Sequence, residues 1–126
     1  MKRVLVVDDD PQVAGVIKAY LERTGQYEVR ILSEAKGILA YVHDFKPEVI
    51  LLDLLMPGIG GLEACKMLDD DSAGINIPII VLSGLDNETD RIKAYKLGVV
   101  DYLVKSIRPK ELLASVEKAL KFKSPG

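Results

Sequence analysis

VILLDLLMPG, residues Val49–Gly58, is the most informative segment of the sequence for predicting the fold. Its first four residues form a continuous apolar run without alternation, which is typical of a strand buried on both faces of a parallel sheet. Asp53 interrupts the apolar run shortly before Pro57 and Gly58 end it. Because an unpaired charge inside a core is costly, we expect Asp53 at the carboxyl end of the strand, where open α/β sheets hold their ligands.

Size and composition indicate one ordinary globular domain. The 126 residues are 48% hydrophobic and 29% charged, with a formal net charge of -2, which gives no electrostatic case for a nucleic-acid partner or an acidic membrane surface. Cys65 is the single cysteine, so no internal disulfide can form and a reducing, cytoplasmic compartment is expected. No apolar run approaches the roughly 20 residues of a membrane span.

Five short apolar runs alternate along the chain with five segments of helical periodicity. This alternation predicts an α/β fold, a doubly wound five-stranded parallel sheet with helices on both faces. Periodicity does not give the strand order, but the most apolar runs, the first, third and fourth, are expected at the centre. The flavodoxin-like order 2-1-3-4-5 satisfies this condition. Helix caps are expected at Asp10, at Ser33 and at either Asp86 or Asn87.

Polar side chains follow the expected strands at the same edge of the sheet. The first strand is followed by Asp8 and Asp9, the third ends in Asp53, the fourth in Ser83 and the fifth in Lys105. In the order 2-1-3-4-5 these groups converge. Three neighbouring carboxylates repel one another and need a compensating cation. An all-oxygen set without histidine or cysteine suits a hard cation, Mg²⁺ above all, with Mn²⁺ or Ca²⁺ as substitutes.

The remaining groups at this edge suit phosphoryl transfer. Lys105 and the Ser83 hydroxyl could hold the oxygens of a phosphoryl group opposite the metal, and phosphoryl transfer needs mostly positioning and charge neutralisation. The nucleophile would be a carboxylate. Asp53 is the best candidate, because it is the single acid on the central strand and leaves Asp8 and Asp9 for the metal.

Four motifs carry a family resemblance. They are VVDD at 6–9, LDLLMPG at 52–58, VLSG at 81–84 and DYLVK at 101–105. With these motifs in this order, the chain resembles the receiver domains of two-component response regulators, of the chemotaxis-regulator type. The resemblance covers essentially the whole sequence. It implies a receiver domain over residues 1–121, followed at 122–126 by a tail or the start of a linker.

The resemblance also implies a site and its partners. Asp53 is then the phosphoacceptor, taking its phosphoryl group from a histidine kinase or a histidine phosphotransfer protein, and Lys105 pairs with that group. Such a chain is not a turnover enzyme, although it catalyses its own phosphorylation and slow dephosphorylation. The implied Mg²⁺ ligands are Asp8, Asp9, Asp53 and the backbone carbonyl of Leu55.

The same resemblance implies a switch. Ser83 moves toward the arriving phosphate and Tyr102 turns inward, which changes the surface of the fourth helix, fifth strand and fifth helix. That surface would contact a downstream effector protein or domain, or a second copy in a phosphorylation-dependent dimer. The alternative for Tyr102 is a fixed amphipathic edge residue.

Two positions depart from the family pattern. Ser106 follows the lysine where proline is common, and a cis bond before a non-proline residue costs roughly 2.5–4 kcal/mol. We therefore predict a trans Lys105–Ser106 bond or, as the alternative, a strained cis bond. Gly60 stands where aspartate is common, so the third helix is expected to start late or fray.

Three other functions compete with the receiver. A phosphorylation-independent interaction module of the same fold usually lacks one of the acids or the lysine, and this sequence has all of them. A flavodoxin-like cofactor binder needs a phosphate-binding loop after the first strand, but the chain has the anion-repelling Asp8-Asp9-Asp10 there. A phosphatase would need a second acid two residues beyond the nucleophile, where Leu55 stands.

Overall fold

The structure, a computed structural model, describes residues 1–56, 58–84 and 88–122. Strands alternate with helices along this part of the chain, as the apolar runs predict. The strands are β1 (Lys2–Val7), β2 (Tyr27–Leu32), β3 (Val49–Asp53), β4 (Ile79–Ser83) and β5 (Asp101–Val104). The helices are α1 (Pro11–Glu22), the 3₁₀ turn η1 (Ala35–Gly37), α2 (Ile38–Phe45), α3 (Gly61–Asp69), α4 (Glu88–Lys96) and α5 (Pro109–Lys121).

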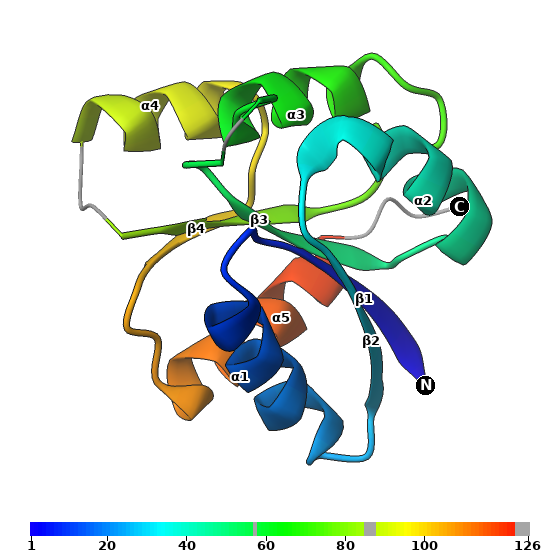
Figure 1. Cartoon of the computed structure of the whole chain (residues 1–126), viewed down its shortest axis with the longest axis vertical. Helices are drawn as coiled ribbons and strands as arrows, with labels where there is room; N and C mark the ends of the chain where they lie inside the picture. The colour runs from blue at the N-terminus through cyan, green and yellow to red at the C-terminus, as the bar shows by residue number, and fades with distance from the viewer. Residues whose placement is uncertain (57, 85–87, 123–126) are drawn as a thin grey trace.

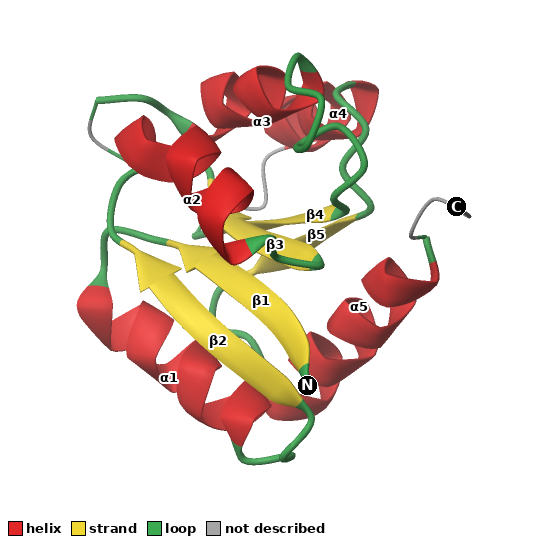
Figure 2. Cartoon of the chain, turned by 90° about the vertical axis from the view of Figure 1, so that its right-hand side faces the viewer, coloured by secondary structure: helices red, strands yellow, loops and turns green. Residues whose placement is uncertain are grey.

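The five strands form one parallel sheet in the order β2-β1-β3-β4-β5, which confirms the predicted order. Helices α2, α3 and α4 cover one face of the sheet, and α1 and α5 cover the other (Figure 1). The view turned by 90° shows the parallel strands between these two layers (Figure 2). In register, Val7 of β1 lies beside Leu52 of β3, so Asp8, directly after β1, and Asp53, the last residue of β3, are neighbours at the carboxyl ends of these strands.

Residues of the central strands alternate between two hydrophobic cores. Leu5, Ile50 and Leu52 pack beneath α2 and α3, while Val4 and Leu51 pack against α1 and α5. A parallel strand covered on both faces has no solvated side, and every residue of β3 is buried. This burial explains the unbroken apolar run before Asp53.

The helix starts correct some local predictions. The Asp10 carboxylate accepts hydrogen bonds from the N–H groups of Gln12 and Val13, which confirms this cap. The Ser33 cap is wrong, because the chain first forms the 3₁₀ turn η1, whose cap position is Glu34. Helix α3 begins at Gly61, directly after Gly60 in an extended cap conformation, so the late start is also wrong. The expected cap at Asp86 or Asn87 lies outside the described residues.

In the parts of the chain that are described, no helix has both the length and the apolar character needed to cross a membrane.

Candidate functional site

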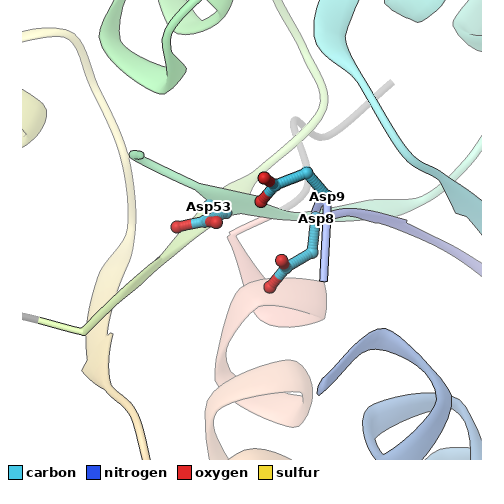
Figure 3. Close-up of side chains that lie close together, drawn as sticks. All are labelled: Asp8, Asp9 and Asp53. Atoms are coloured by element: carbon cyan, nitrogen blue, oxygen red, sulfur yellow. The ribbon is translucent and has the colours of Figure 1, made fainter. Parts of the chain in front are cut away.

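Three carboxylates meet at the carboxyl ends of β1 and β3. Asp8 is buried directly after β1, Asp53 is buried at the end of β3, and Asp9 is exposed. Each offers a carboxylate oxygen within 4.8 Å of those of the others. Figure 3 shows the three side chains gathered at these two strand ends. The predicted convergence of the acids therefore follows from the pairing of the two central strands.

Lys105 brings a cation from the end of β5 to the same place. Its Nζ lies 3.0 Å from Asp8 Oδ2 and 3.4 Å from Asp53 Oδ2. Its backbone N–H donates to the carbonyl of Ser83 at 2.8 Å, which joins the ends of β4 and β5. The peptide bond from Lys105 to Ser106 is cis. Of the two predicted forms, trans is wrong and the alternative, cis, is the one present; the general preference for trans at a non-proline residue does not decide this bond.

Burial and mutual charge set the electrostatics of the site. Burial raises the pKa of Asp53, and the Asp8 charge adds to that rise, against the hydrogen bond from the Leu55 N–H and the Lys105 ammonium. Burial alone would lower the pKa of Lys105, but its hydrogen bonds and charge interactions with Asp8 and Asp53 outweigh it, so this pKa is raised. Lys105 contacts two of the three clustered carboxylates, so among the described residues their negative charge is only partly compensated.

The donor set fits a hard divalent cation. Asp8 Oδ2 is buried, and among the described residues it contacts the Lys105 ammonium at 3.0 Å. The other oxygen, Asp8 Oδ1, accepts the Asp10 N–H at 2.9 Å, which fixes the carboxylate. Carboxylate oxygens are the ligands that Mg²⁺ and Ca²⁺ prefer. The Leu55 N–H donates to Asp53 Oδ1 at 3.2 Å, which holds Leu55 beside the site. That the backbone carbonyl of Leu55 is a metal ligand stays a prediction.

Gly61 is a supporting position that the sequence interpretation missed. A Cβ there would lie 2.5 Å from the Asp53 carbonyl oxygen and 2.6 Å from the Leu54 Cα, closer than real Cβ atoms come. The Gly61 N–H also donates to the Leu54 carbonyl at 3.1 Å. Only glycine lets α3 begin this close to the residue that carries the central carboxylate. In the sequence, the Gly60–Gly61 pair indicates a boundary between two elements. It does not indicate the close approach of Gly61 to Asp53 and Leu54.

The predicted switch residues lie on the two outer strands of this half of the sheet. Ser83 is buried at the end of β4 and pairs in register with Val104, while Tyr102 is 4% exposed and pairs with Val81. The Arg91 guanidinium of α4 lies over the Tyr102 ring, with Cζ 4.6 Å from the ring centroid. No sequence motif pointed to Arg91.

Comparison with known proteins identifies the family. The family model of the response regulator receiver domain matches residues 4–117. The chain belongs to this family. Its match runs from β1 into α5 and includes every strand of the sheet. The chain is thus a receiver domain of the two-component response regulators.

Similar proteins and structures agree with this assignment. The receiver domain is 34% identical over 125 residues to the phosphate regulon transcriptional regulatory protein PhoB of Pseudomonas aeruginosa, covering 99% of this chain and 54% of PhoB. It is 33% identical over 120 residues to the DNA-binding response regulator MtrA of Mycolicibacterium smegmatis, covering 95% of this chain and 51% of MtrA. The chain therefore spans about half the length of these relatives.

Among solved structures, the activated N-terminal receiver domain of Klebsiella pneumoniae RstA matches with a TM-score of 0.87 and 29% identity, over 95% of this chain and 99% of that one. The chemotaxis protein CheY4 of Vibrio cholerae matches with a TM-score of 0.88 and 27% identity, over 94% of this chain and 98% of that one. The sheet and both helical layers are thus those of known receiver domains.

Proposed function

We propose that the receiver domain accepts a phosphoryl group on Asp53 from a phosphohistidine and catalyses this transfer itself. One observation carries the proposal. The Lys105 ammonium contacts both Asp8 and Asp53, beside carboxylates whose charge it only partly compensates. Phosphoryl transfer depends mainly on positioning and on neutralising charge. A buried acid beside a positioned ammonium and a cation-binding set of carboxylates meets both needs.

In the proposed transfer, a carboxylate oxygen of Asp53 forms the new P–O bond while the P–N bond of the donor breaks. The electron pair of the P–N bond leaves with the imidazole nitrogen of the donor. Lys105 pairs with a phosphoryl oxygen, and the Ser83 hydroxyl donates to another. The chain thereby keeps the group as an aspartyl phosphate and is not a turnover enzyme.

A divalent cation completes the proposed site. Mg²⁺, with Mn²⁺ or Ca²⁺ as substitutes, supplies positive charge to the phosphoryl oxygens when it is bound. The excess of carboxylate over ammonium charge at Asp8, Asp9 and Asp53 supports this assignment, since clustered carboxylates repel one another unless a cation compensates them. The proposed ligands are Asp8, Asp9, Asp53 and the backbone carbonyl of Leu55.

The proposal extends to partners and readout. The donor is a histidine kinase or a histidine phosphotransfer protein in the cytoplasm, and phosphorylation acts through Ser83 and Tyr102 on the surface of α4, β5 and α5. That surface contacts an effector protein or domain, or a second copy of the receiver. We take the receiver domain to span 1–121, since α5 ends at Lys121, with 122–126 as a tail or the start of a linker.

The test is intact-mass spectrometry after incubation with a small phosphodonor such as acetyl phosphate. The mass should rise by one phosphoryl group with Mg²⁺ and stay unchanged with EDTA. Asp53→Asn should abolish the rise. Asp71→Asn is the matched control, because it removes a carboxylate between α3 and β4, away from the site, and should leave labelling intact. Absence of labelling with every donor would favour the phosphorylation-independent interaction module.

A further inference from the structure

The contact between Arg91 and Tyr102 joins α4 to β5. The Arg91 guanidinium lies over the face of a ring that is already 4% exposed, 4.6 Å from its centroid. The negative face of an aromatic ring attracts a cation in this position, and the attraction grows as water is excluded. The stack therefore stabilises the buried place of the ring.

Helix α4 is lightly packed elsewhere. Of its described side chains, only Ala94 is buried, while Ile92 and Tyr95 are 49% and 43% exposed. In contrast, α5 buries four residues along its inner face. Most of the stability of a helix in a protein comes from packing of its apolar face. A helix that buries a single alanine depends more on contacts at its margin, such as the stack of Arg91 on Tyr102.

The backbone beneath the ring is held from the other side. The Tyr102 N–H donates to Asp101 Oδ1 at 2.9 Å, and Ser115 Oγ of α5 donates to Asp101 Oδ2 at 2.7 Å. Tyr102 also pairs with Val81 in the sheet. With its backbone fixed, the ring can leave its place only by rotation of its side chain, and this rotation would break the stack with Arg91.

We propose that Arg91 is a positioning residue that holds the Tyr102 ring in its buried place before any phosphoryl group arrives. The ring is then buried before phosphorylation. It does not make the inward turn on phosphorylation that the family resemblance implies. Its resting position does not depend on the proposed function. The second part of the proposal rests on that function: when phosphorylation of Asp53 changes the surface of α4, the Tyr102 ring is already buried beneath Arg91.

The first experiment maps tyrosine nitration by tetranitromethane with peptide mass spectrometry. In the resting protein, Tyr102 should react much more slowly than Tyr95, the exposed standard on α4. Arg91→Ala should accelerate nitration of Tyr102 roughly two- to thirty-fold, the range that a cation–π contact implies. Tyr27, also 4% exposed but packed against other elements, should stay unchanged and so shows that the variant is folded.

Two further variants separate the stack from general charge. Arg91→Lys keeps a cation and should restore part of the protection of Tyr102. Lys93→Ala removes an exposed cation from the same helix and should leave nitration of Tyr102 unchanged. Equal rates for Tyr102 in the wild type and in Arg91→Ala, with Tyr27 protected in both, would overturn the proposal.

The second experiment repeats the mapping with Mg²⁺ and beryllium fluoride, a phosphoryl mimic. Nitration of wild-type Tyr102 should change by less than about twofold. A ring that reacts as fast as Tyr95 at rest and becomes protected with the mimic would overturn the proposal in favour of an inward switch. The resting measurement needs no phosphorylation, so failure of Asp53 labelling would count against the proposed function and not against the role of Arg91.

Discussion

The sheet has one edge where its parallel strands begin, the amino edge, and one where they end, the carboxyl edge. Both carry ion pairs, but with opposite charge balance. At the amino edge, Lys2 and Arg3 each lie 3.5 Å from the Glu48 carboxylate. The Arg3 Nε also donates to the carbonyls of Phe45 and Lys46 at the end of α2, where a cation is favoured by the helix dipole. At the carboxyl edge, one ammonium serves several carboxylates.

This difference separates a structural contact from a functional one. Each edge has a buried carboxylate oxygen in an ion pair, Glu48 Oε2 with Lys2 and Asp8 Oδ2 with Lys105. A buried, ion-paired oxygen therefore does not distinguish the edges, and the charge balance does. At the amino edge, Lys2 and Arg3 pair with Glu48, and Arg3 also donates to the carbonyls at the end of α2. Repulsion between Asp8 and Asp53, in contrast, does not stabilise the fold. Such uncompensated charge is typical of a site that binds something else.

The largest expected effect tests the balance at the carboxyl edge. Lys105→Met removes the cation that pairs with Asp8 and Asp53, and it should lower the free energy of unfolding by about 3 kcal/mol at pH 7 without Mg²⁺, since it leaves buried charge unpaired. Urea denaturation measures this change. The control, Lys2→Met at the amino edge, should cost about 0.5 kcal/mol or less. Equal losses for the two variants would refute the contrast between the edges.

Metal addition should compensate the excess charge directly. At a hundredfold excess over its Kd, Mg²⁺ should raise the free energy of unfolding by about 2.7 kcal/mol, because it binds only the folded chain. EDTA should reverse the gain, and Asp9→Asn should reduce it. Urea titrations at constant ionic strength are the measurement. An equal gain from NaCl alone would indicate general screening and no metal site.

A smaller effect is expected at the amino edge. Glu48→Gln removes the negative charge shared by Lys2 and Arg3 but leaves Arg3 its two carbonyl acceptors, so it should cost about 1 kcal/mol. Mg²⁺ should not change this loss. If Mg²⁺ restored the stability of Glu48→Gln as it does that of Lys105→Met, the amino edge would also bind cations.

The smallest expected effect concerns Asp71, in the loop that enters β4. Hydrogen bonds from the His43 side chain and from the N–H groups of Gly74 and Ala73 hold the pKa of Asp71 below its ordinary value. Its contribution to stability is then fully present above that ordinary value, about pH 3.9, and is lost as the pH falls through the lowered pKa. Asp71→Asn should be slightly less stable at pH 6 and should lack this acid loss. Parallel thermal midpoints of the two proteins from pH 2 to 6 would contradict the assignment.

Much of the fold was predictable because burial on two faces leaves a clear pattern. A central parallel strand has no solvated side, so the continuous apolar runs of β1, β3 and β4 placed these strands inside the sheet. The more polar run Tyr27–Leu32 indicates a strand at the side of the sheet, and β2 is the outermost strand there. The positions of Asp8, Asp53 and Lys105 then followed from topology, since parallel strands end at one edge.

Features that depend on contacts between distant residues were missed or mistaken. The start of α2 is set by the turn η1, so a good capping residue such as Ser33 is not used. Gly61 is required by the approach of α3 to Asp53, which no local pattern reports. In the sequence, Arg91 is indistinguishable from an ordinary surface charge. Its role depends on the contact between α4 and β5 that places it over the Tyr102 ring.

Residue type and order along the chain are enough to predict which strands are central, which edge of the sheet collects the charges and which family the motifs resemble. These properties depend on burial and on strand direction, which residue type and order encode locally. The contact of the Lys105 ammonium with two carboxylates and the place of Arg91 over the Tyr102 ring become visible only in the folded chain. Such contacts depend on strand register and on helix placement to within an ångström, which are set by packing among residues far apart in the chain.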